Sequence, residues 1–271
     1  MSDFIRGEYL PDMCDMRYGT ERNLPYRECL EVPDKEHVSI YAKTEHLCGA
    51  FNVIKNNPSK LFTLVTHNSD MPIQTCNTPD NLYRWFCQNR DTEQLRIHSL
   101  PIGLENEYWH PHKQQTLEDA PSFDTRIVSA FAQFNPATRP QDRGPLMRDL
   151  QSGEIEGDVY GCINGANYDL FVENLRRYAF CICPRGNGID THRMWEALYM
   201  RCIPIVQNFQ AHNFNIDIHN KCAPLPILYV DNWREITPEL LQHTHNSIDR
   251  SGFGSELLSV RYWKGLITNE N

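Results

Sequence analysis

A glycine-bearing turn next to arginine residues carries the clearest chemical signal in this chain. An apolar run of strand length ends at Cys183, the turn Pro-Arg-Gly-Asn-Gly occupies 184–188, and a helix-like run begins near Asp190. Glycine lets backbone N–H groups approach a ligand closely, and a helix N-terminus presents unpaired donors with partial positive charge. The segment therefore predicts a cradle for an anion. Its expected members are Arg185, Gly186, Asn187, Gly188 and Thr191.

The charge of this segment supports an anionic ligand. Residues 176–202 contain five Arg against one Asp and one Glu, a surplus of three positive charges in a chain of net charge −9. On a helical wheel of about 100° per residue, His192, Arg193 and Glu196 fall in one arc, opposite the apolar residues of the same helix. We therefore expect one face of this helix to pack and the other to bind.

Arg193 and Glu196 indicate which anion could bind. An Arg beside a phosphate, with a carboxylate one helical turn further along, can hold a diphosphate and then a ribose diol, because a carboxylate accepts hydrogen bonds from both hydroxyls. The same residues could instead form an ordinary surface pair at i,i+3 spacing, worth about a few tenths of a kcal/mol. The neighbouring glycine turn favours the first interpretation, which predicts a nucleoside diphosphate.

Other nucleotide-binding motifs do not match. A P-loop requires Lys and then Ser or Thr after its last glycine, whereas Ile189 and Asp190 follow Gly188. A dinucleotide-binding fingerprint requires a third glycine at the position where this chain has Thr191. Kinase and dehydrogenase chemistry is therefore not supported.

The second half of the chain alternates between strand and helix patterns. The expected strands are 126–134, 157–162, 178–183, 202–206 and 227–230, and the expected helices are 141–150, 168–177, 191–201, 238–243 and 255–267. Such alternation implies a parallel sheet with right-handed crossovers. The fold class is therefore α/β.

The first half of the chain is less regular. The expected strands are 37–41, 60–67 and 95–100, and the expected helices are 48–55 and 81–88. The central strand ends at His67 and runs into a polar turn that ends at Asp70, and polar side chains just past a buried strand are where α/β folds keep their chemistry. The stretch 112–125 shows no periodicity and predicts a linker, with a domain boundary near residue 115.

Composition narrows the function classes. Acidic residues outnumber basic ones by 35 to 26, which argues against a nucleic-acid partner because phosphate backbones require a basic face. No stretch reaches the roughly 18–20 apolar residues of a membrane span, and the first residues lack the apolar run of a signal peptide. The 10 cysteines form no C-x-x-C pair, and no N-glycosylation sequon is present. We therefore expect reduced, buried thiols and a cytoplasmic protein.

Residues 168–206 resemble the C-terminal signature of exostosin-like glycosyltransferases. In that signature a helix precedes a strand ending in F-C-x-x-P-R-G, matched here at 180–186. An R-x-x-E-A-L helix follows, matched at 193–198, and then an Ile-Pro strand, matched at 203–206. The likeness continues at 225–237 and, more weakly, at 99–103.

The resemblance implies the GT-B architecture, in which two Rossmann-like domains face each other across a cleft. Residues 1–115 would form the acceptor-binding domain and residues 116–271 the domain that binds the nucleotide sugar. Transfer would invert the anomeric carbon. Carried onto this sequence, Arg193 would contact the donor diphosphate and Glu196 the ribose, and the turn 186–188 would contact the phosphate or the sugar. Arg143 is a second phosphate candidate, or else an exposed residue at a helix start.

Inverting transfer makes two demands on the protein. The departing diphosphate needs cationic or N–H stabilisation, which Arg185, Arg193 and the helix N-terminus can supply. Because no D-x-D motif occurs, no metal cofactor is expected. The acceptor hydroxyl also needs a general base. Asp70 is the first candidate because it follows the clearest N-terminal strand, His67 is the second and Glu105 the third. His67 could instead close the strand, and Asp70 could cap the turn.

The family's animal members are longer Golgi proteins with a membrane anchor, and this compact chain departs from them. The resemblance therefore points to a soluble microbial or viral member that acts in the cytoplasm, that of the host if it is viral. The implied donor is a UDP-sugar, with UDP-xylose as the first choice, and the implied acceptor is a glycan.

Two other classes stay open. A non-catalytic module could keep the cradle for a nucleotide sugar or a glycan without any chemistry. A glycosidase with paired carboxylates would hydrolyse a glycan with no nucleotide present, although no carboxylate pair lies in a comparable motif. The aromatic residues that could stack on a sugar, or could simply be buried, are Trp85, Tyr108, Trp109 and Trp195.

Overall fold

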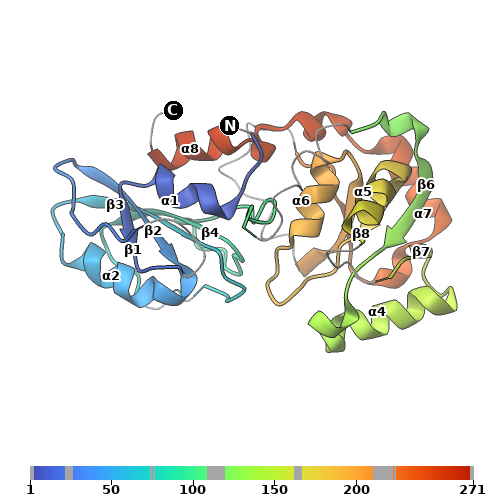
Figure 1. The fold of residues 1–271 in the computed structure, drawn as a ribbon, viewed down its shortest axis with the longest axis horizontal. Coiled ribbons are helices and arrows are strands. Elements are labelled where there is room, and N and C mark those ends of the chain that lie inside the picture. Colours follow the sequence, from blue (N-terminus) through green and yellow to red (C-terminus); the bar gives the residue numbers. More distant parts are fainter. Residues whose placement is uncertain are drawn as a thin grey trace.

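The chain folds into two α/β units, each built on a parallel sheet of five strands, as a computed structural model shows (Figure 1). The structure describes residues 3–21, 27–73, 75, 77–108, 120–161, 167–209, 222 and 224–268. The two units lie side by side along the longest axis of the molecule. The α/β class predicted from the alternation of strands and helices is therefore confirmed.

The first sheet has its strands in chain order. They are β1 (Met16–Tyr18), β2 (His37–Lys43), β3 (Leu61–His67), β4 (Leu82–Cys87) and β5 (Ile97–Ser99). Successive side chains of a strand point to opposite faces. Ile40, Leu64 and Trp85 stand in register on one face. They share a core with the apolar side of α2 (Leu47–Lys55), so this helix covers that face.

The last helix covers the opposite face of the first sheet. Tyr41, Val65 and Phe86 lie in register on that face and share a core with Trp263 of α8 (Val260–Thr268). Figure 1 shows α8 beside α1 (Leu10–Met13), which is too short to cover the face alone. The sequence pattern assigns 255–267 to the second domain. The helix lies in the first unit instead, because its apolar side has a bare sheet face to cover there. The expected boundary near residue 115 lies outside the described residues.

The second sheet has the strand order β10-β9-β8-β6-β7. Its strands are β6 (Ile127–Ala132), β7 (Asp158–Val159), β8 (Tyr178–Ile182), β9 (Ile203–Gln207) and β10 (Leu228–Val230). The chain moves from β6 outward to β7 and then returns to the other side of β6 at β8. The order therefore reverses between β6 and β8. In open parallel sheets, ligands bind beyond the carboxyl ends of the strands at such a switch point.

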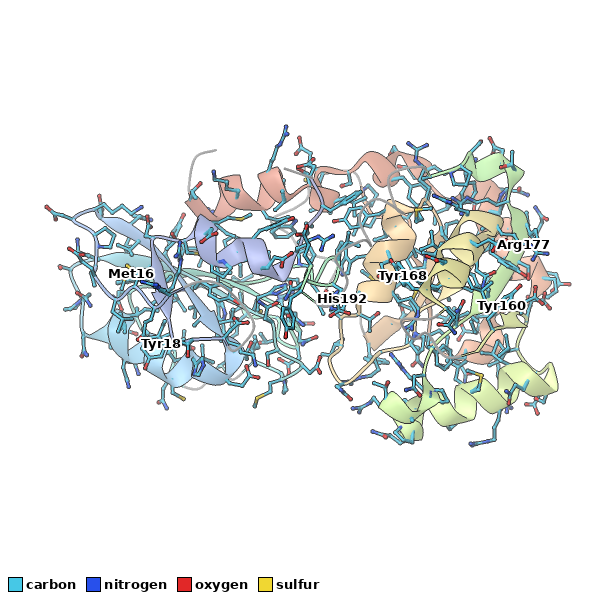
Figure 2. The ribbon with its side chains drawn as sticks, viewed as in Figure 1. Met16, Tyr18, Tyr160, Tyr168, Arg177 and His192 are labelled. Carbon is cyan, nitrogen blue, oxygen red and sulfur yellow. The ribbon has the colours of Figure 1, made fainter. Side chains whose placement is uncertain are left out.

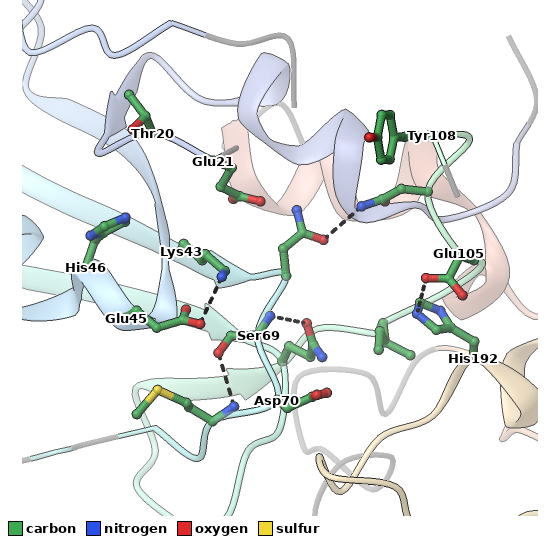
Figure 3. A pocket seen from close by; sticks show the side chains of 15 residues that line it. Thr20, Glu21, Lys43, Glu45, His46, Ser69, Asp70, Glu105, Tyr108 and His192 are labelled. Carbon is green, nitrogen blue, oxygen red and sulfur yellow. Dashed lines mark hydrogen bonds and ion pairs between the residues drawn. The ribbon is translucent and has the colours of Figure 1, made fainter. Parts of the chain in front are cut away.

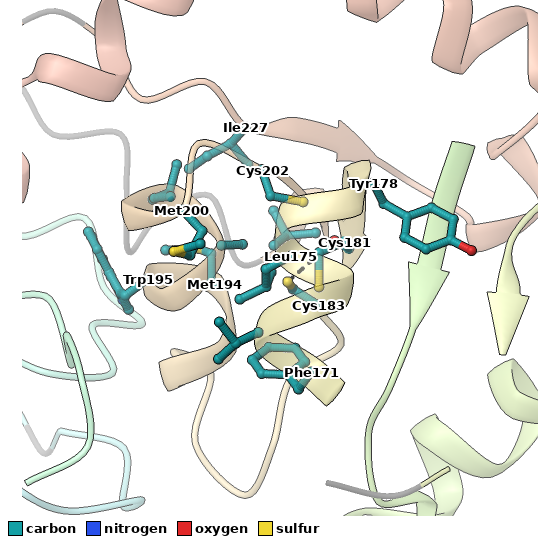
Figure 4. Close-up of a cluster of buried hydrophobic side chains, with 14 of the residues drawn as sticks. Phe171, Leu175, Tyr178, Cys181, Cys183, Met194, Trp195, Met200, Cys202 and Ile227 are labelled. Atoms are coloured by element: carbon teal, nitrogen blue, oxygen red, sulfur yellow. Dashed lines mark hydrogen bonds between the residues drawn. The ribbon is translucent and has the colours of Figure 1, made fainter. Parts of the chain in front are cut away.

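Helices cover both faces of the second sheet. The buried side chains of α4 (Pro140–Ser152) and α7 (Pro238–Ser247) pack on one face, and those of α5 (Tyr168–Arg177) and α6 (His192–Tyr199) pack on the other. Cys181 and Cys183 point to the α5–α6 face, near Phe171 and Met194 (Figure 4). Both thiols thus lie on one face of the sheet, and the eight described cysteines are all free.

One predicted element is wrong. The stretch 81–88 is expected as a helix, but Leu82–Cys87 forms strand β4, which pairs with β3 on one side and β5 on the other. Its aromatic residues suit a pleated sheet, and pairing with two neighbours outweighs a weak local preference. Strand β1 is also absent from the expected set. Within the described ranges, no helix is both long enough and apolar enough to cross a lipid bilayer.

Candidate functional site

The carboxyl ends of the first sheet meet the loop that follows β8. Asn89, just past β4, has a left-handed backbone with φ of 56°. Its Oδ1 accepts hydrogen bonds from the backbone N–H groups of Ile189 at 2.9 Å and Asp190 at 3.0 Å, while its Nδ2 donates to the backbone oxygen of Ser69 at 2.8 Å. One amide side chain thus joins the two units at their strand ends.

A cavity of about 700 Å³ opens at the strand ends of the first sheet (Figure 3). Its ionisable lining residues are the carboxylates Glu21, Glu45, Asp70 and Glu105, the imidazoles His46 and His192, and the ammonium group of Lys43. Lys43 Nζ lies 2.9 Å from Glu45 Oε1. The cavity is rich in groups that accept hydrogen bonds from hydroxyls, which is suitable for a polyhydroxylated ligand.

Asp70 lies in this cavity, as expected for a residue just past β3. Its side chain is exposed, and its Oδ2 accepts a hydrogen bond of 3.4 Å from Asn187 Nδ2 of the glycine turn. Asp70 therefore faces both the cavity and the turn that the sequence assigns to phosphate binding. Its role as a base stays a prediction.

His67 lies beneath the cavity and does not line it. The side chain is 1% exposed, with Nε2 2.9 Å from the backbone oxygen of Pro101 and Nδ1 3.2 Å from Asn68 Oδ1. Burial lowers the pKa of His67 to about 4, so the ring is neutral near pH 7. Both ring nitrogens are engaged, which suits a residue that closes the strand better than one that removes a proton from a ligand.

His192 belongs to the second unit and lies at its junction with the first (Figure 2), where it lines the same cavity (Figure 3). Its Nδ1 lies 2.8 Å from the backbone oxygen of Gly103, and its Nε2 lies 3.6 Å from Glu105 Oε1. The sequence groups His192 with the donor-binding residues. The structure instead directs this side chain toward the first sheet, together with Glu105, the third candidate base.

Arginine side chains gather at the switch point between β6 and β8. Arg143 of α4 is 4% exposed and donates to the backbone oxygens of Pro184, Arg185 and Asn135 at 3.2, 2.8 and 3.2 Å. Burial, and then the nearby charge of Arg193, lower the pKa of Arg143 to about 10. Arg143 therefore holds the backbone of Pro184 and Arg185, at the start of the turn, in place. It is not an exposed residue at a helix start.

Arg193 lies beside Arg143 and has more freedom. Its Nε donates to the backbone oxygen of Gln133 at 3.1 Å, just past β6, and its guanidinium lies 6.0 Å from the ring centroid of Phe171. Among the residues that the structure describes, no carboxylate lies within ion-pair distance of Arg143 or Arg193. Two neighbouring cations without an acidic partner are suitable for an anionic ligand.

The glycine turn holds unpaired donors next to these cations. In the described part of the chain, the backbone N–H groups of 185–188 donate to no protein acceptor, and the buried Nε of Arg185 has no partner. The N–H groups of the two following residues are different, because Asn89 occupies them. The donors left available by the protein are therefore those of 185–188, in the first part of the turn, and the anion cradle that these residues would form stays a prediction.

Asp190 and Thr191 form the junction between the turn and α6. Asp190 is 4% exposed, and its carboxylate accepts hydrogen bonds from Thr191 N–H, Trp195 Nε1 and the backbone N–H of Ile102 in the first unit, each at 2.8 Å. Burial raises the pKa of Asp190 to about 6, against the effect of these bonds. Thr191 stands at the N-cap position with extended backbone and makes no capping hydrogen bond with its side chain.

Glu196 is more buried than the helical wheel suggests. Its side chain is 3% exposed, and Tyr168 donates from its hydroxyl to Glu196 Oε1 at 3.3 Å. Burial and then the charge of Glu196 raise the pKa of Tyr168, so this tyrosine remains a hydrogen-bond donor. A ribose would have to reach the carboxylate beside Tyr168, and the ribose role of Glu196 stays a prediction.

Some residues of the site escape the sequence patterns, and some candidates lie elsewhere. Lys43 is the last residue of β2 and Glu45 lies just past it, so the rule that chemistry lies at strand ends could have found them. The same rule does not point to Asn89, because a helix is expected at 81–88 where the structure has strand β4. Of the aromatic candidates, Tyr108 lines the cavity, Trp85 and Trp195 are buried in the cores, and Trp109 lies outside the described residues.

The described residues contain no group of three or more His, Cys, Asp or Glu side chains placed to bind a metal ion, and the expected absence of a metal stays a prediction. The similarity to exostosin-like enzymes rests on the motifs quoted above. No protein-family model matches the chain, and no curated protein matches it.

Proposed function

We propose that the chain is an inverting glycosyltransferase with a GT-B arrangement, which moves a sugar from a UDP-sugar to a hydroxyl of a glycan. The observation that carries the proposal is the run of unpaired N–H groups at 185–188 beside Arg193, at the switch point of the second sheet. UDP-xylose is the first donor to test, because the likeness to exostosin-like enzymes points to it.

The donor side of the proposal follows from charge and geometry. A diphosphate offers several anionic oxygens, which match backbone N–H groups and the planar guanidinium of Arg193. Arg143 would hold the turn in place and add positive charge from behind. Glu196, one helical turn from Arg193, is the proposed partner of the ribose.

The acceptor side is proposed to be the cavity of the first sheet. Glu45, Asp70 and Glu105 lie on its wall and can accept hydrogen bonds from sugar hydroxyls. Asp70 accepts from Asn187 of the turn, so the cavity and the cradle are adjacent. A sugar carried by the cradle would therefore face a hydroxyl held in the cavity.

The reaction needs positive charge at the leaving group and a proton acceptor at the nucleophile. Negative charge grows on the diphosphate as its bond to the sugar breaks, and Arg193 and the N–H groups of the turn would stabilise it. These groups supply the required charge, so the proposal includes no metal. The eight described cysteines are free, which supports action in a reducing cytoplasm, that of the host if the chain is viral.

The experiment is a titration of the protein with UDP and UMP, followed by a turnover assay. We expect UDP to bind more tightly than UMP, because the cradle holds the second phosphate, and we expect UDP to be released from UDP-xylose in the presence of methyl glycosides. Arg193→Gln should weaken UDP binding about tenfold or more, a loss of about 1.4 kcal/mol.

Arg177→Gln is the matched control. Arg177 is an exposed residue at the end of α5 in the same unit, and it lies over the ring of Tyr178. This variant should bind UDP as the unchanged protein does. Equal affinity for UDP in the Arg193 variant and the unchanged protein would refute the donor site. Binding without turnover of any UDP-sugar would leave a nucleotide-sugar-binding module.

A further inference from the structure

We infer that His192 takes the proton from the acceptor hydroxyl and that Glu105 stabilises the resulting imidazolium. This inference rests on the proposed transferase function and deepens it, since it assigns the proton acceptor to the helix that also carries Arg193. It differs from the expectation drawn from the sequence, in which Asp70 is the base and His192 binds the donor.

The backbone oxygen of Gly103 sets the tautomer of His192. A carbonyl oxygen has no hydrogen, so the 2.8 Å contact with Nδ1 requires the proton to be on Nδ1. Nε2 of the neutral ring then carries the lone pair. His192 lines the cavity, and its Nε2 is on the side of Glu105, which lines the cavity too (Figure 3). The contact thus fixes the orientation of the ring and, when the ring is neutral, the tautomer that a general base requires.

Glu105 is placed to stabilise the ring after it accepts the proton. Its Oε1 lies 3.6 Å from Nε2 of His192, and both side chains are partly exposed to the cavity. Arg6, which is fully buried, donates from Nη1 to the backbone oxygen of Glu105 at 2.9 Å and so fixes this segment. A carboxylate near an imidazole favours the imidazolium through its negative charge. Here the carboxylate lies on the Nε2 side of the ring, next to the nitrogen that takes the proton.

The charged surroundings of His192 single out Glu105. Asp190 and His67 are also close enough to interact electrostatically with His192. Both side chains are buried and make hydrogen bonds to the backbone of Pro101 or Ile102. Of the carboxylates in the described ranges, Glu105 alone is within 4 Å of the ring. Asp70 lies in the same cavity, but it accepts from Asn187, a contact that suits a residue that orients the acceptor.

The position of His192 in the chain couples the two ends of the reaction. His192 is the first residue of α6 and Arg193 is the second, so their Cα atoms are about 3.8 Å apart. His192 contacts the loop after β5 of the first sheet, while Arg193 contacts the backbone just past β6 of the second. A sugar between them would have the nucleophile on one side and the leaving diphosphate on the other, as a single displacement requires.

The proposed step is balanced in atoms and charge. The acceptor oxygen forms a bond to C1 of the sugar, and its proton moves to Nε2 of His192. The bond between C1 and the phosphate oxygen breaks, and its electron pair leaves with UDP. The imidazolium then gives the proton to water, which returns the ring to the neutral state.

His192→Asn tests the inference directly. The amide of Asn can donate to the Gly103 oxygen in place of Nδ1–H, but it has no basic nitrogen. We expect kcat for UDP release from UDP-xylose, with methyl glycosides as acceptors, to fall about 10²–10⁴-fold. The affinity for UDP and the thermal midpoint should remain near their original values. The acidic limb of the kcat–pH profile should disappear.

Glu105→Gln and His243→Asn complete the set. Removing the carboxylate should lower kcat, but less than His192→Asn does, because the imidazolium loses its partner while the base remains. His243 is an exposed residue of α7, and its variant should behave as the unchanged protein.

The outcomes separate the two proposals. A His192→Asn variant that keeps more than about a tenth of kcat, or keeps the acidic limb, would overturn the inference while the transferase function stands. A protein that binds UDP no better than UMP and releases none from UDP-xylose would overturn both. If His192→Asn loses turnover and also has a lowered thermal midpoint, His192→Ala is tested with added imidazole. Recovery of turnover by imidazole would then support His192 as the base, and no recovery would count against it.

Discussion

The side chain of Asn89 fills the space beside Gly188. A Cβ on Gly188 would lie 2.7 Å from Asn89 Oδ1, closer than real contacts allow, so any other residue at this position would displace the Asn89 amide. The same oxygen accepts from the N–H groups of Ile189 and Asp190. An amide of the first unit therefore occupies the place where an anion is expected at the end of the turn, and the free N–H groups are those that precede it.

Removing the Asn89 side chain should weaken the contact between the two units, which we call the seam and which Asn89 makes with Ile189 and Asp190. Asn89→Gly keeps the left-handed backbone without strain but removes the oxygen that accepts from the N–H groups of Ile189 and Asp190. Loss of the acceptor for the buried Asp190 N–H costs about 1–3 kcal/mol. We expect a lower free energy of unfolding in urea. Asn77→Gly is the matched control, since Asn77 is exposed and has φ of 60°. Equal losses in the two variants would mean that Asn89 does not hold the seam.

Asp190 should make stability depend on pH. Its pKa is about 6 when folded and 3.8 in the reference state, so the folded state binds more protons between these values. This contribution to stability is complete below about pH 4 and is lost as pH rises through about 6, a change of about 3 kcal/mol. The stability of the unchanged protein relative to Asp190→Asn should therefore fall from pH 4 to pH 7, as measured by urea unfolding. A constant difference would contradict the raised pKa.

Arg143 should matter for both stability and donor binding. Arg143→Lys keeps the charge but loses the planar set of donors that contacts three backbone oxygens. We expect a loss of about 1–3 kcal/mol in the free energy of unfolding and weaker UDP binding by calorimetry. Arg148→Lys, at an exposed position of the same helix, should change neither quantity. Unchanged UDP affinity in Arg143→Lys would separate Arg143 from the donor site.

Glu196 should confer a preference for ribose. The unchanged protein is expected to bind UDP more tightly than 2′-deoxy-UDP, because a carboxylate can accept hydrogen bonds from both ribose hydroxyls. Glu196→Ala should weaken UDP binding and abolish that preference. Tyr168→Phe removes only the hydroxyl that contacts Glu196 and should retain the preference. If Glu196→Ala still discriminates between the two nucleotides, the ribose contact lies elsewhere.

Asp70 and His192 can be distinguished by the size and kind of their effects. Asp70→Asn should leave UDP affinity unchanged, raise KM for the methyl glycoside and lower kcat less than His192→Asn does. Kinetics with varied acceptor concentration give both quantities. The opposite result, in which Asp70→Asn abolishes turnover and His192→Asn does not, would assign the base to Asp70, as the sequence alone suggests.

The sequence predicts the elements of the second unit better than those of the first. The helix expected at 168–177 is observed as Tyr168–Arg177, because its amphipathic pattern and its charged last turn are local signals. The strands at 60–67 and 178–183 are apolar and bounded by turns, and both are observed. The stretch 81–88 has aromatic residues that suit a strand but no continuous apolar run, and its pairing with two neighbouring strands decides its structure.

The site follows the same division. The proposed cradle at 185–188 could be predicted from the sequence, because the glycines and the arginine that suggest it are adjacent in the chain. The contacts of Asn89 with Ile189 and Asp190 span about 100 positions, so no local pattern reveals them. A helical wheel places His192 and Glu196 in one arc, but it cannot show that His192 faces the first sheet or that Glu196 is buried beside Tyr168.

Because α8 covers Tyr41, Val65 and Phe86, residues from both ends of the described chain belong to one core. A fragment that stops at residue 108 would expose that face of the sheet to water and would be prone to aggregate. Folding of the first unit can therefore be completed only after residues 260–268 have been synthesised. The first unit thus depends on a segment from the far end of the described chain.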